Sequence, residues 1–542
     1  MQINFSDIPK NHNLYLDYLY EFENVSEFYK HDFREKEKYS GLFNDIINSR
    51  SGREINLTSL IKNQYLSLPQ ASEKTLTNIA NLNEKRTLAI VTGQQLGIFG
   101  GPLYTFYKII TAIKLARQLK ERYEEFNFVP VFWLEGDDHD FNEIRKIKLI
   151  NKENELSEFT YSEEIPEDDT KKSVGSLTLT SEINSVLELI KNSLRETEFT
   201  PDLLSQLSKI YTNGKTIKQA FKELIFWLFD EYGLLILDPQ DKEIKSLLIP
   251  VFTHEVEGFR EHTQKLVLTS AKLEEIYHAQ VKIKPVNLFY STDDGRYSIE
   301  PVDDTFRLRR KRKQFTKEEL LDTIKNEPER FSPNVLLRPI CQDYLLPTAF
   351  YVAGPSEIAY FAQVTPLYDF FKIQTPIIYP RASITIIEKN LQAHLDKFNL
   401  ELKDIFIKAD TLKDQIIASV SDKNLDTLFE DSNRQIELII DDLKTHLFSI
   451  DKTISDSSDR YRDKMLSSLF ELKNKALQAQ KKKHEISLKQ IDKISESLYP
   501  AENLQERELN FIYFTNKYGD SFLKKIFDET IVNCFEHQVI LI

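Results

Sequence analysis

The stretch that decides the fold is TLAIVTGQQLGIFGGPLYTFYKIITAIKLARQLKERY, residues 87–123. It opens with a short apolar run typical of a buried strand, continues through a glycine-rich loop and ends in an amphipathic helical pattern. A second apolar run, FVPVFWLEG at 128–136, and a third, GLLILDPQD at 233–241, follow it. Strand, helix and strand in this order predict an α/β fold with a Rossmann-like, doubly wound parallel sheet.

Segments outside this pattern are expected to be additions to the sheet. The second and third apolar runs are separated by about a hundred residues of mixed, charged sequence, and VKIKPVNLFYSTDDGRYSIEPV (281–302) alternates around Asp-Asp-Gly like a β-hairpin. YPRASITII (379–387) predicts a further strand. We therefore predict a Rossmann-like core in two parts, 1–140 and 231–387, separated by a connective insertion at 141–230. The second core part carries a β-hairpin insertion at 281–315. An antiparallel coiled coil follows at 388–498, and a C-terminal segment at 499–542 packs back on the core.

The coiled coil is predicted from an absence of loop-forming residues. From 381 to 499 the chain has neither glycine nor proline, which favours nearly uninterrupted helix. Apolar residues recur there every three or four positions, over 425–454 and again over 461–486. The polar segment SDSSD (455–459) between them is the predicted point of chain reversal. The hairpin either projects or lies flat on the core, and its apolar seam is expected to pair two chains into a homodimer.

Composition limits the classes of function. Hydrophobic residues make up 41% and charged residues 29%, as in an ordinary globular protein, and the net charge of −14 argues against a nucleic-acid partner. No apolar run is long enough for a membrane span, and the first residues do not form a signal peptide. Two cysteines, Cys341 and Cys534, cannot make a disulfide framework, and no Cys/His spacing predicts zinc. We therefore expect a cytoplasmic protein.

The basic run RLRRKRKQF (307–315) is either solvated surface or a phosphate-binding edge.

The loop GQQLGIFGG (93–101) is the first candidate site. Glycine lets the backbone approach a ligand, and the amides at the start of the following helix attract phosphate or carboxylate. The alternative is a purely structural turn. The pattern is neither GxGxxG nor Walker A, so it predicts neither a nicotinamide site nor a P-loop. The candidate substrate-binding residues here are Gly93, Gln94, Gly97, Gly100, Gly101, Thr105 and Lys108.

The second candidate site is EGDDHD (135–140), just past the carboxyl end of the second strand, where parallel sheets bind ligands. A carboxylate beside His139 favours the imidazolium and fixes one tautomer, which suits a general base. The same carboxylates could instead hold Mg²⁺ for a nucleotide, or cap the helix FNEIRKI that follows. The predicted catalytic residues are Gln95, Asp138, His139 and Asp140.

The third candidate site is the segment 337–371, where polar residues interrupt an apolar frame rich in proline. Such polar groups are either satisfied internally or face a cleft. Arg381, in the strand that follows, is suited to bind a carboxylate or phosphate, whereas Cys341 has apolar neighbours and is interpreted as an inert buried thiol. The candidate substrate-binding residues here are Gln342, Asp343, Ser356, Glu357, Tyr360 and Arg381.

These motifs match a known family. GQQLGIFGGPLYTFYK, FWLEGDDHDFNEI, RPICQDYLLPT, GPSEIAYFAQ and YPRASIT, followed by the coiled-coil pattern, resemble the bacillithiol biosynthesis cysteine-adding enzymes over nearly the whole chain. The resemblance implies a Rossmann-type core with a connective-peptide insertion and a coiled coil that dimerises. It also implies a ligase that adds cysteine to glucosaminyl malate in the last step of bacillithiol synthesis. An adenine nucleotide, ATP or ADP, is implied near the C-terminal segment, where the candidate residues are Arg507, Asn510, Lys517 and Tyr518.

The chemistry of such a ligase can be assigned to residues as a hypothesis. Joining a carboxylate to an amine in water requires activation of the acid, as an acyl phosphate or an acyl adenylate, and an amine held in line for attack. The 93–101 loop would stabilise negative charge, His139 would take a proton from the amine, and Arg381 would hold the malate carboxylates. The alternatives are a class I nucleotidyltransferase or tRNA-synthetase-like enzyme for another substrate, although HIGH-like and KMSKS-like elements are absent, and a non-catalytic coiled-coil scaffold.

Overall fold

A computed structural model describes residues 1–50, 55–138, 140–161, 172–420, 425–483 and 485–542. They form two compact units. The first consists of Met1–Ile386 with Leu504–Leu541, and the second of Ile387–Asn503 with Ile542.

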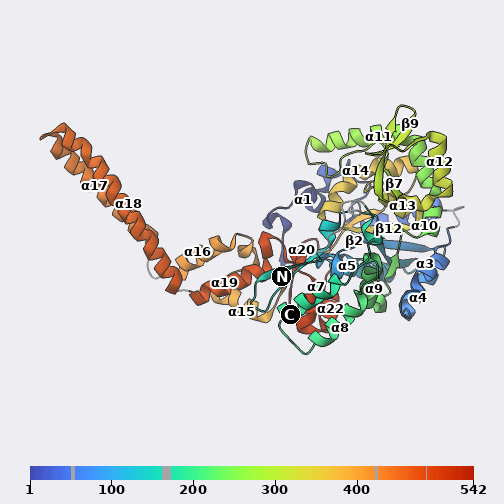
Figure 1. The fold of residues 1–542 in the computed structure, drawn as a ribbon, viewed down its shortest axis with the longest axis horizontal. Helices are drawn as coiled ribbons and strands as arrows, with labels where there is room; N and C mark the ends of the chain where they lie inside the picture. The colour runs from blue at the N-terminus through green and yellow to red at the C-terminus, as the bar shows by residue number, and fades with distance from the viewer. Residues whose placement is uncertain (51–54, 139, 162–171, 421–424, 484) are drawn as a thin grey trace. The chain divides into compact units, whose positions relative to one another are not determined.

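A five-stranded parallel sheet lies at the centre of the first unit (Figure 1). Its spatial order is β13-β12-β2-β3-β6, and every neighbouring pair runs parallel. The chain builds outward from β2 first to β3 and β6, and then on the other side to β12 and β13, so the order reverses between β2 and β12. The predicted doubly wound sheet is therefore confirmed. The strands are β2 (Thr87–Gln95), β3 (Asn127–Glu135), β6 (Leu235–Leu237), β12 (Thr348–Ala353) and β13 (Ile377–Pro380).

Strand β2 and helix α5 (Tyr104–Arg122) follow the predicted pattern. Residues 88–91 are fully buried, and α5 packs against both β2 and β3, which explains why these strands are apolar along their whole length. β2 runs three residues beyond the predicted end at Thr92, because 93–95 continue the pairing as far as Gln95 opposite Glu135. The extension brings the two side chains to the same edge of the sheet.

A second sheet, antiparallel and also five-stranded, contains the predicted hairpin. β7 (Leu288–Thr292) pairs with β8 (Gly295–Val302) across the Asp-Asp turn. The rest of this sheet was not predicted, and its order is β10-β9-β8-β7-β11. The basic run lies on β9, β10 and their turn, where Arg307 and Arg309 pair with Glu300. The other strands are β9 (Thr305–Leu308), β10 (Gln314–Thr316) and β11 (Phe331–Pro333).

Two predicted elements differ from the structure. The segment 379–387 is not one strand, because β13 ends at Pro380, which lacks an N–H donor, and β14 (Ser383–Ile387) belongs to a sheet with β15 (His537–Leu541) and β1 (Gln2–Ile3). FNEIRKI forms only one helical turn, α6 (Phe141–Ile144). Its continuation alternates apolar and polar residues and pairs as a hairpin of β4 (Lys146–Ile150) and β5 (Leu156–Thr160).

The second unit contains a helical hairpin of α17 (Leu425–Phe448) and α18 (Lys452–Lys483), which pack side by side (Figure 1). The predicted reversal at 455–459 is wrong, since the chain turns at 449–451. Asp451 accepts the Thr453 amide (2.6 Å) and starts α18, while Ser455 donates to the Lys444 carbonyl (3.0 Å) and is buried. Small serines near the closed end let the two arms pack closely, so their polarity does not signal a loop.

The remaining helices cover the sheets or lie beside the hairpin. Among the described helices, none combines the length and apolar character needed to cross a bilayer. Their bounds are α1 (Asn13–Tyr20), α2 (Tyr39–Ser49), α3 (Leu57–Tyr65), α4 (Glu73–Asn81), α7 (Glu182–Ser193), α8 (Thr200–Ile210), α9 (Ile217–Phe229), α10 (Lys242–Leu247), α11 (Ile249–Glu274), α12 (Lys317–Asn326), α13 (Arg338–Leu345), α14 (Pro355–Phe371), α15 (Lys389–Phe398), α16 (Ala409–Val420), α19 (Glu485–Leu498), α20 (Gln505–Glu508), α21 (Phe511–Tyr518) and α22 (Ser521–Glu529).

Candidate active site

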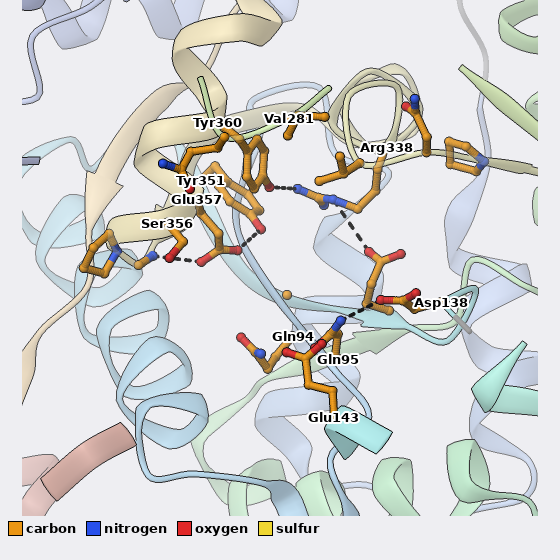
Figure 2. Close-up of a pocket in the computed structure, with 18 of the residues that line it drawn as sticks. Gln94, Gln95, Asp138, Glu143, Val281, Arg338, Tyr351, Ser356, Glu357 and Tyr360 are labelled. Atoms are coloured by element: carbon orange, nitrogen blue, oxygen red, sulfur yellow. Dashed lines mark hydrogen bonds and ion pairs between the residues drawn. The ribbon is translucent and has the colours of Figure 1, made fainter. Parts of the chain in front are cut away.

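A cavity of about 700 Å³ opens at the carboxyl ends of β2, β3 and β12, where the strand order reverses. Doubly wound sheets bind their ligands at this point. Figure 2 shows Gln94, Gln95 and Glu143 on one side of the cavity, with Tyr351, Glu357, Tyr360 and Arg338 on the opposite side. The predicted residues that line it are Gly93, Gln94, Gln95, Lys108, Asp138, Ser356, Glu357, Tyr360, Arg381 and Arg507.

A second cavity of about 240 Å³ adjoins the first at the start of α5. The two share Gln94, Gln95, Tyr104, Glu143 and Arg507. Of the predicted residues, Gly97, Gly101, Thr105 and Asn510 line only the second. The Thr105 hydroxyl is fully buried there and has no hydrogen-bond partner among the described residues, so it is a polar group that a ligand could satisfy.

The glycines of the 93–101 loop serve packing as well as the cavities. A Cβ at Gly97 would lie 2.8 Å from the Gly101 Cα, and Gly100 and Gly101 have φ values of 84° and 68°. The Gly100 and Gly101 amides donate to the Gly97 and Ile98 carbonyls, so they close the turn. Gly100 lines neither cavity. Only part of the cluster therefore faces a ligand.

The Asp-rich segment divides between the cavity and the scaffold. Gln95 donates to Asp138 (2.6 Å) at the cavity, whereas the exposed Asp140 accepts the Glu143 amide (3.1 Å), caps α6 and lines neither cavity. Burial alone would raise the pKa of Asp137, but Lys245, 2.9 Å away, holds it below its usual value. The predicted general base, His139, lies outside the described residues.

An ion pair between the buried Lys108 and the half-buried Glu357 links the ends of β2 and β12. The Lys108 ammonium contacts the Glu357 carboxylate and also donates to the Gln94 side chain (2.8 Å) and the Gly93 carbonyl (2.9 Å). Glu357 accepts from the Tyr351 hydroxyl (2.7 Å). Burial would raise the pKa of Glu357, but the Lys108 ammonium holds it below its ordinary value. These contacts fix the edge of the sheet on which the cavity is built.

Arg338 and Glu135 form a second charged group that the sequence did not single out. The Arg338 guanidinium donates to the Tyr360 hydroxyl (2.9 Å) and the Gln342 amide oxygen (2.9 Å), and its Nε lies 3.6 Å from Glu135 Oε2. Burial raises the pKa of Glu135 to about 7, against the opposing effect of Arg338. Glu135 is the first residue of EGDDHD and Arg338 is the first residue of RPICQDY. Their places at the start of two predicted motifs were the signal by which the sequence could have identified them.

The predicted residues Gln342 and Asp343 lie behind Arg338 and line neither cavity. Gln342 donates to Asp343 (2.8 Å), which also accepts from the Tyr368 hydroxyl. Burial raises the pKa of Asp343 to about 6. This buried network holds the guanidinium in position.

Arg381 lines the cavity, but its charge is compensated. Its guanidinium donates to Glu506 (2.6 Å), which is buried and also accepts from Ser383 (2.9 Å). The hypothesis that Arg381 holds malate carboxylates therefore lacks support in this geometry.

The nucleotide candidates are scattered. Arg507 borders both cavities, and Asn510 donates to the Phe99 (2.9 Å) and Gly101 (2.6 Å) carbonyls, which secures the glycine loop. Lys517 lies over the Tyr513 ring, 4.1 Å from its centroid, and neither Lys517 nor Tyr518 lines a cavity described above. Within the described part of the chain, no group of three or more His, Cys, Asp or Glu side chains is arranged to hold a metal ion.

Comparisons with known proteins identify the family. A family model described as the N-terminal Rossmann-like domain of the bacillithiol biosynthesis protein BshC matches residues 1–382, and that of its C-terminal coiled-coil domain matches 384–542. The chain belongs to the BshC family. The resemblance seen in the motifs is thereby confirmed.

Relatives match the chain over nearly its full length. Proteins named "Putative cysteine ligase BshC" include one from Salinibacter ruber, 34% identical over 97% of this chain and 96% of that protein, and one from Chloroherpeton thalassium, 34% identical over 95% and 93%. A solved structure named as a putative arginyl-tRNA synthetase from Campylobacter jejuni covers 81% of this chain and 99% of its own, at 11% identity and a TM-score of 0.23, too low to support an argument.

Proposed function

We propose that this protein joins the carboxyl group of cysteine to the amine of glucosaminyl malate, the last step of bacillithiol synthesis. The observation that carries the proposal is the cavity at the point where the strand order reverses, lined by charged groups of both signs. Its volume of about 700 Å³ lies in the range of cavities that enclose a small organic molecule. The names of the relatives support cysteine as one substrate.

The reaction needs an activated acid. ATP would convert the cysteine carboxylate into an acyl phosphate or acyl adenylate. The sugar amine then attacks the acyl carbon, the C–N bond forms, phosphate or AMP leaves and the ammonium loses a proton. The smaller cavity suits the phosphates, since none of the described residues satisfies the buried Thr105 hydroxyl there and Lys146 and Arg507 line its wall. Magnesium would accompany the phosphates of the nucleotide.

Glu135 is the described group best suited to accept the proton. It lines the larger cavity, and its contact with the Arg338 guanidinium is long, at 3.6 Å. A general base is most effective when its pKa lies near the working pH, and burial raises the pKa of Glu135 to about 7. His139 stays a prediction for the same role.

The coiled-coil unit is proposed to form a homodimer. α17 and α18 expose large apolar side chains, including Leu438, Ile439 and Leu472, and a second copy of the hairpin would cover them. We also propose that the enzyme works in the cytoplasm, where its cysteine substrate stays reduced.

A coupling assay tests the function. The purified protein is incubated with cysteine, glucosaminyl malate and ATP, and the coupled thiol is measured by mass spectrometry. We expect product from the wild type and from Arg307→Gln, a change outside both cavities, and at least about 100-fold less from Arg338→Gln. Wild-type rates from Arg338→Gln would remove this cavity from the mechanism. ATP consumption with no coupled thiol would favour a nucleotidyltransferase for another substrate.

A further inference from the structure

The antiparallel sheet supplies one wall of the larger cavity through Lys284, Phe289 and Arg296. Lys284 precedes β7, Phe289 lies on β7 and Arg296 on β8. The Arg296 guanidinium carbon lies 3.8 Å from the centre of the Phe289 ring, and the Lys284 ammonium lies 4.9 Å from it. One aromatic ring thus holds two cations at the cavity.

Neither cation has an acidic partner among the described residues. Arg296 donates to the Ser332 hydroxyl (2.7 Å) and the Pro333 carbonyl (2.7 Å), which are both neutral. Among the described residues, Lys284 makes no hydrogen bond or ion pair. Burial lowers the pKa of both side chains, although nearby acids oppose the shift of Arg296 and Glu300 opposes that of Lys284. For Lys284 the charges of Arg309 and Arg296 lower the pKa further. Two half-buried cations held against one ring without a direct ion pair are costly, and an anionic ligand would offset that cost.

Three other cations of the cavity contrast with this pair. Lys108 is paired with Glu357, Arg338 with Glu135 and Arg381 with Glu506. Of the acids that influence Arg296 most, Asp137 is paired with Lys245 and Glu135 with Arg338, whereas Asp138 accepts from the neutral Gln95 side chain and keeps its charge. In the described part of the chain none of the three forms a direct ion pair with Arg296. The positive charge at Lys284 and Arg296 is therefore available to a ligand.

The segment that carries Lys284 is held firmly. The Gln363 side chain exchanges two hydrogen bonds with the backbone of Val281, each 2.9 Å long. Thr263 donates to the Pro285 carbonyl (2.8 Å), and the Asn287 amide donates to Glu255 (2.7 Å). A wall fixed on both sides of Lys284 loses little conformational freedom when it binds a ligand.

We propose that Lys284 and Arg296 form a subsite that recognises the carboxylates of the acceptor substrate. This inference rests on the proposed function and deepens it. In glucosaminyl malate the two carboxylates of the malate half would contact this wall, while the sugar amine enters the rest of the cavity. Guanidinium and ammonium groups are the usual partners of carboxylates, and hydrogen bonds between charged groups are about twice as strong as neutral ones.

Binding measurements without cysteine or nucleotide test the subsite separately from catalysis. Calorimetry compares glucosaminyl malate with its dimethyl ester, which keeps the same skeleton, adds two methyl groups and has no carboxylate charge. The wild type is expected to prefer the diacid, and Arg296→Gln and Lys284→Gln should each weaken diacid binding by about 10- to 100-fold without changing that of the diester. Arg307→Gln is the matched control, since it removes an arginine of the same sheet that pairs with Glu300.

Each other outcome would overturn the inference. Unchanged diacid affinity in Lys284→Gln, which breaks no hydrogen bond seen in the described residues, would exclude the subsite even if Arg296→Gln fails to fold. Lost affinity for ATP or inorganic phosphate, with unchanged affinity for glucosaminyl malate, would assign the wall to phosphates instead. In either case, coupled thiol from the wild type would leave the proposed function standing, whereas its absence would count against that function.

Discussion

The two sides of the larger cavity differ in whether their cations form direct ion pairs with acidic side chains. On the side built from the core sheet, Lys108 and Glu357 neutralise each other and fix the ends of β2 and β12. On the side built from the antiparallel sheet, Lys284 and Arg296 share an aromatic ring and lack an acidic partner in the described part of the chain. The comparison teaches that the conspicuous motif residues of the core sheet mostly build the site, while the cations of the opposite wall lie on and just before a hairpin that the sequence predicted as structure and not as a site.

The largest expected effect is at Glu135, the core-sheet acid whose contact with its cation is loose. Glu135→Gln should lower the coupling rate by about 10²- to 10⁴-fold. Because a base must be deprotonated to act, the wild-type rate should rise as pH increases through about 7, where burial places the Glu135 pKa. The rate of coupled-thiol formation between pH 5.5 and 8.5, about one and a half units on either side, checks this. An unchanged profile in the variant would exclude Glu135 as the base.

Measurements of stability test whether the two sides of the cavity differ in charge pairing. Lys108→Met leaves the half-buried Glu357 without its cation, and we expect the free energy of unfolding to fall by about 1–3 kcal/mol. Arg296→Met removes a cation that forms no ion pair with any described residue, and it should cost much less. Denaturant unfolding followed by circular dichroism measures both. Equal losses would show that the two sides do not differ.

The packing role of the glycine loop predicts an effect of similar size. Gly97→Ala places a Cβ 2.8 Å from the Gly101 Cα, and such overpacking should cost about 1–3 kcal/mol. The matched control is Gly41→Ala in α2, where nothing lies within 4 Å and alanine should be neutral or stabilising. Thermal unfolding of both variants checks the difference. If Gly97→Ala were as stable as the wild type, packing would not explain this glycine.

The smallest expected effect separates two nucleotide candidates. Arg507→Gln should raise the KM for ATP by about tenfold, because Arg507 borders both cavities, whereas Lys517→Gln should change it little. Coupling rates measured over a range of ATP concentrations give both values. A larger effect from Lys517→Gln would place the nucleotide elsewhere on the C-terminal segment.

Much of the fold could be predicted from sequence because buried parallel strands are continuously apolar. TLAIVT and FVPVFWLEG became β2 and β3, and their carboxyl ends form the edge of the cavity. The chain reversal was misplaced because polarity alone does not distinguish a loop from closely packed serines. Ser455 shows this, since it is buried against the Lys444 carbonyl.

The candidate site could be predicted only where its residues follow core strands. Gln95 and Asp138 do so, and they hydrogen-bond to each other at the cavity. Arg296 could not be predicted, because only the pairing of β7 with β8 and the placement of their sheet bring it to the cavity. Arg381 was predicted to bind substrate carboxylates because its actual partner, Glu506, lies far along the sequence and their pairing could not be foreseen.

A crystal structure with glucosaminyl malate bound tests the central claim most directly. The account predicts ligand density in the larger cavity, with carboxylates within hydrogen-bond distance of Lys284 and Arg296 and the sugar amine on the same side as Glu135. Density for the ligand at another site, with this cavity filled only by solvent, would contradict it.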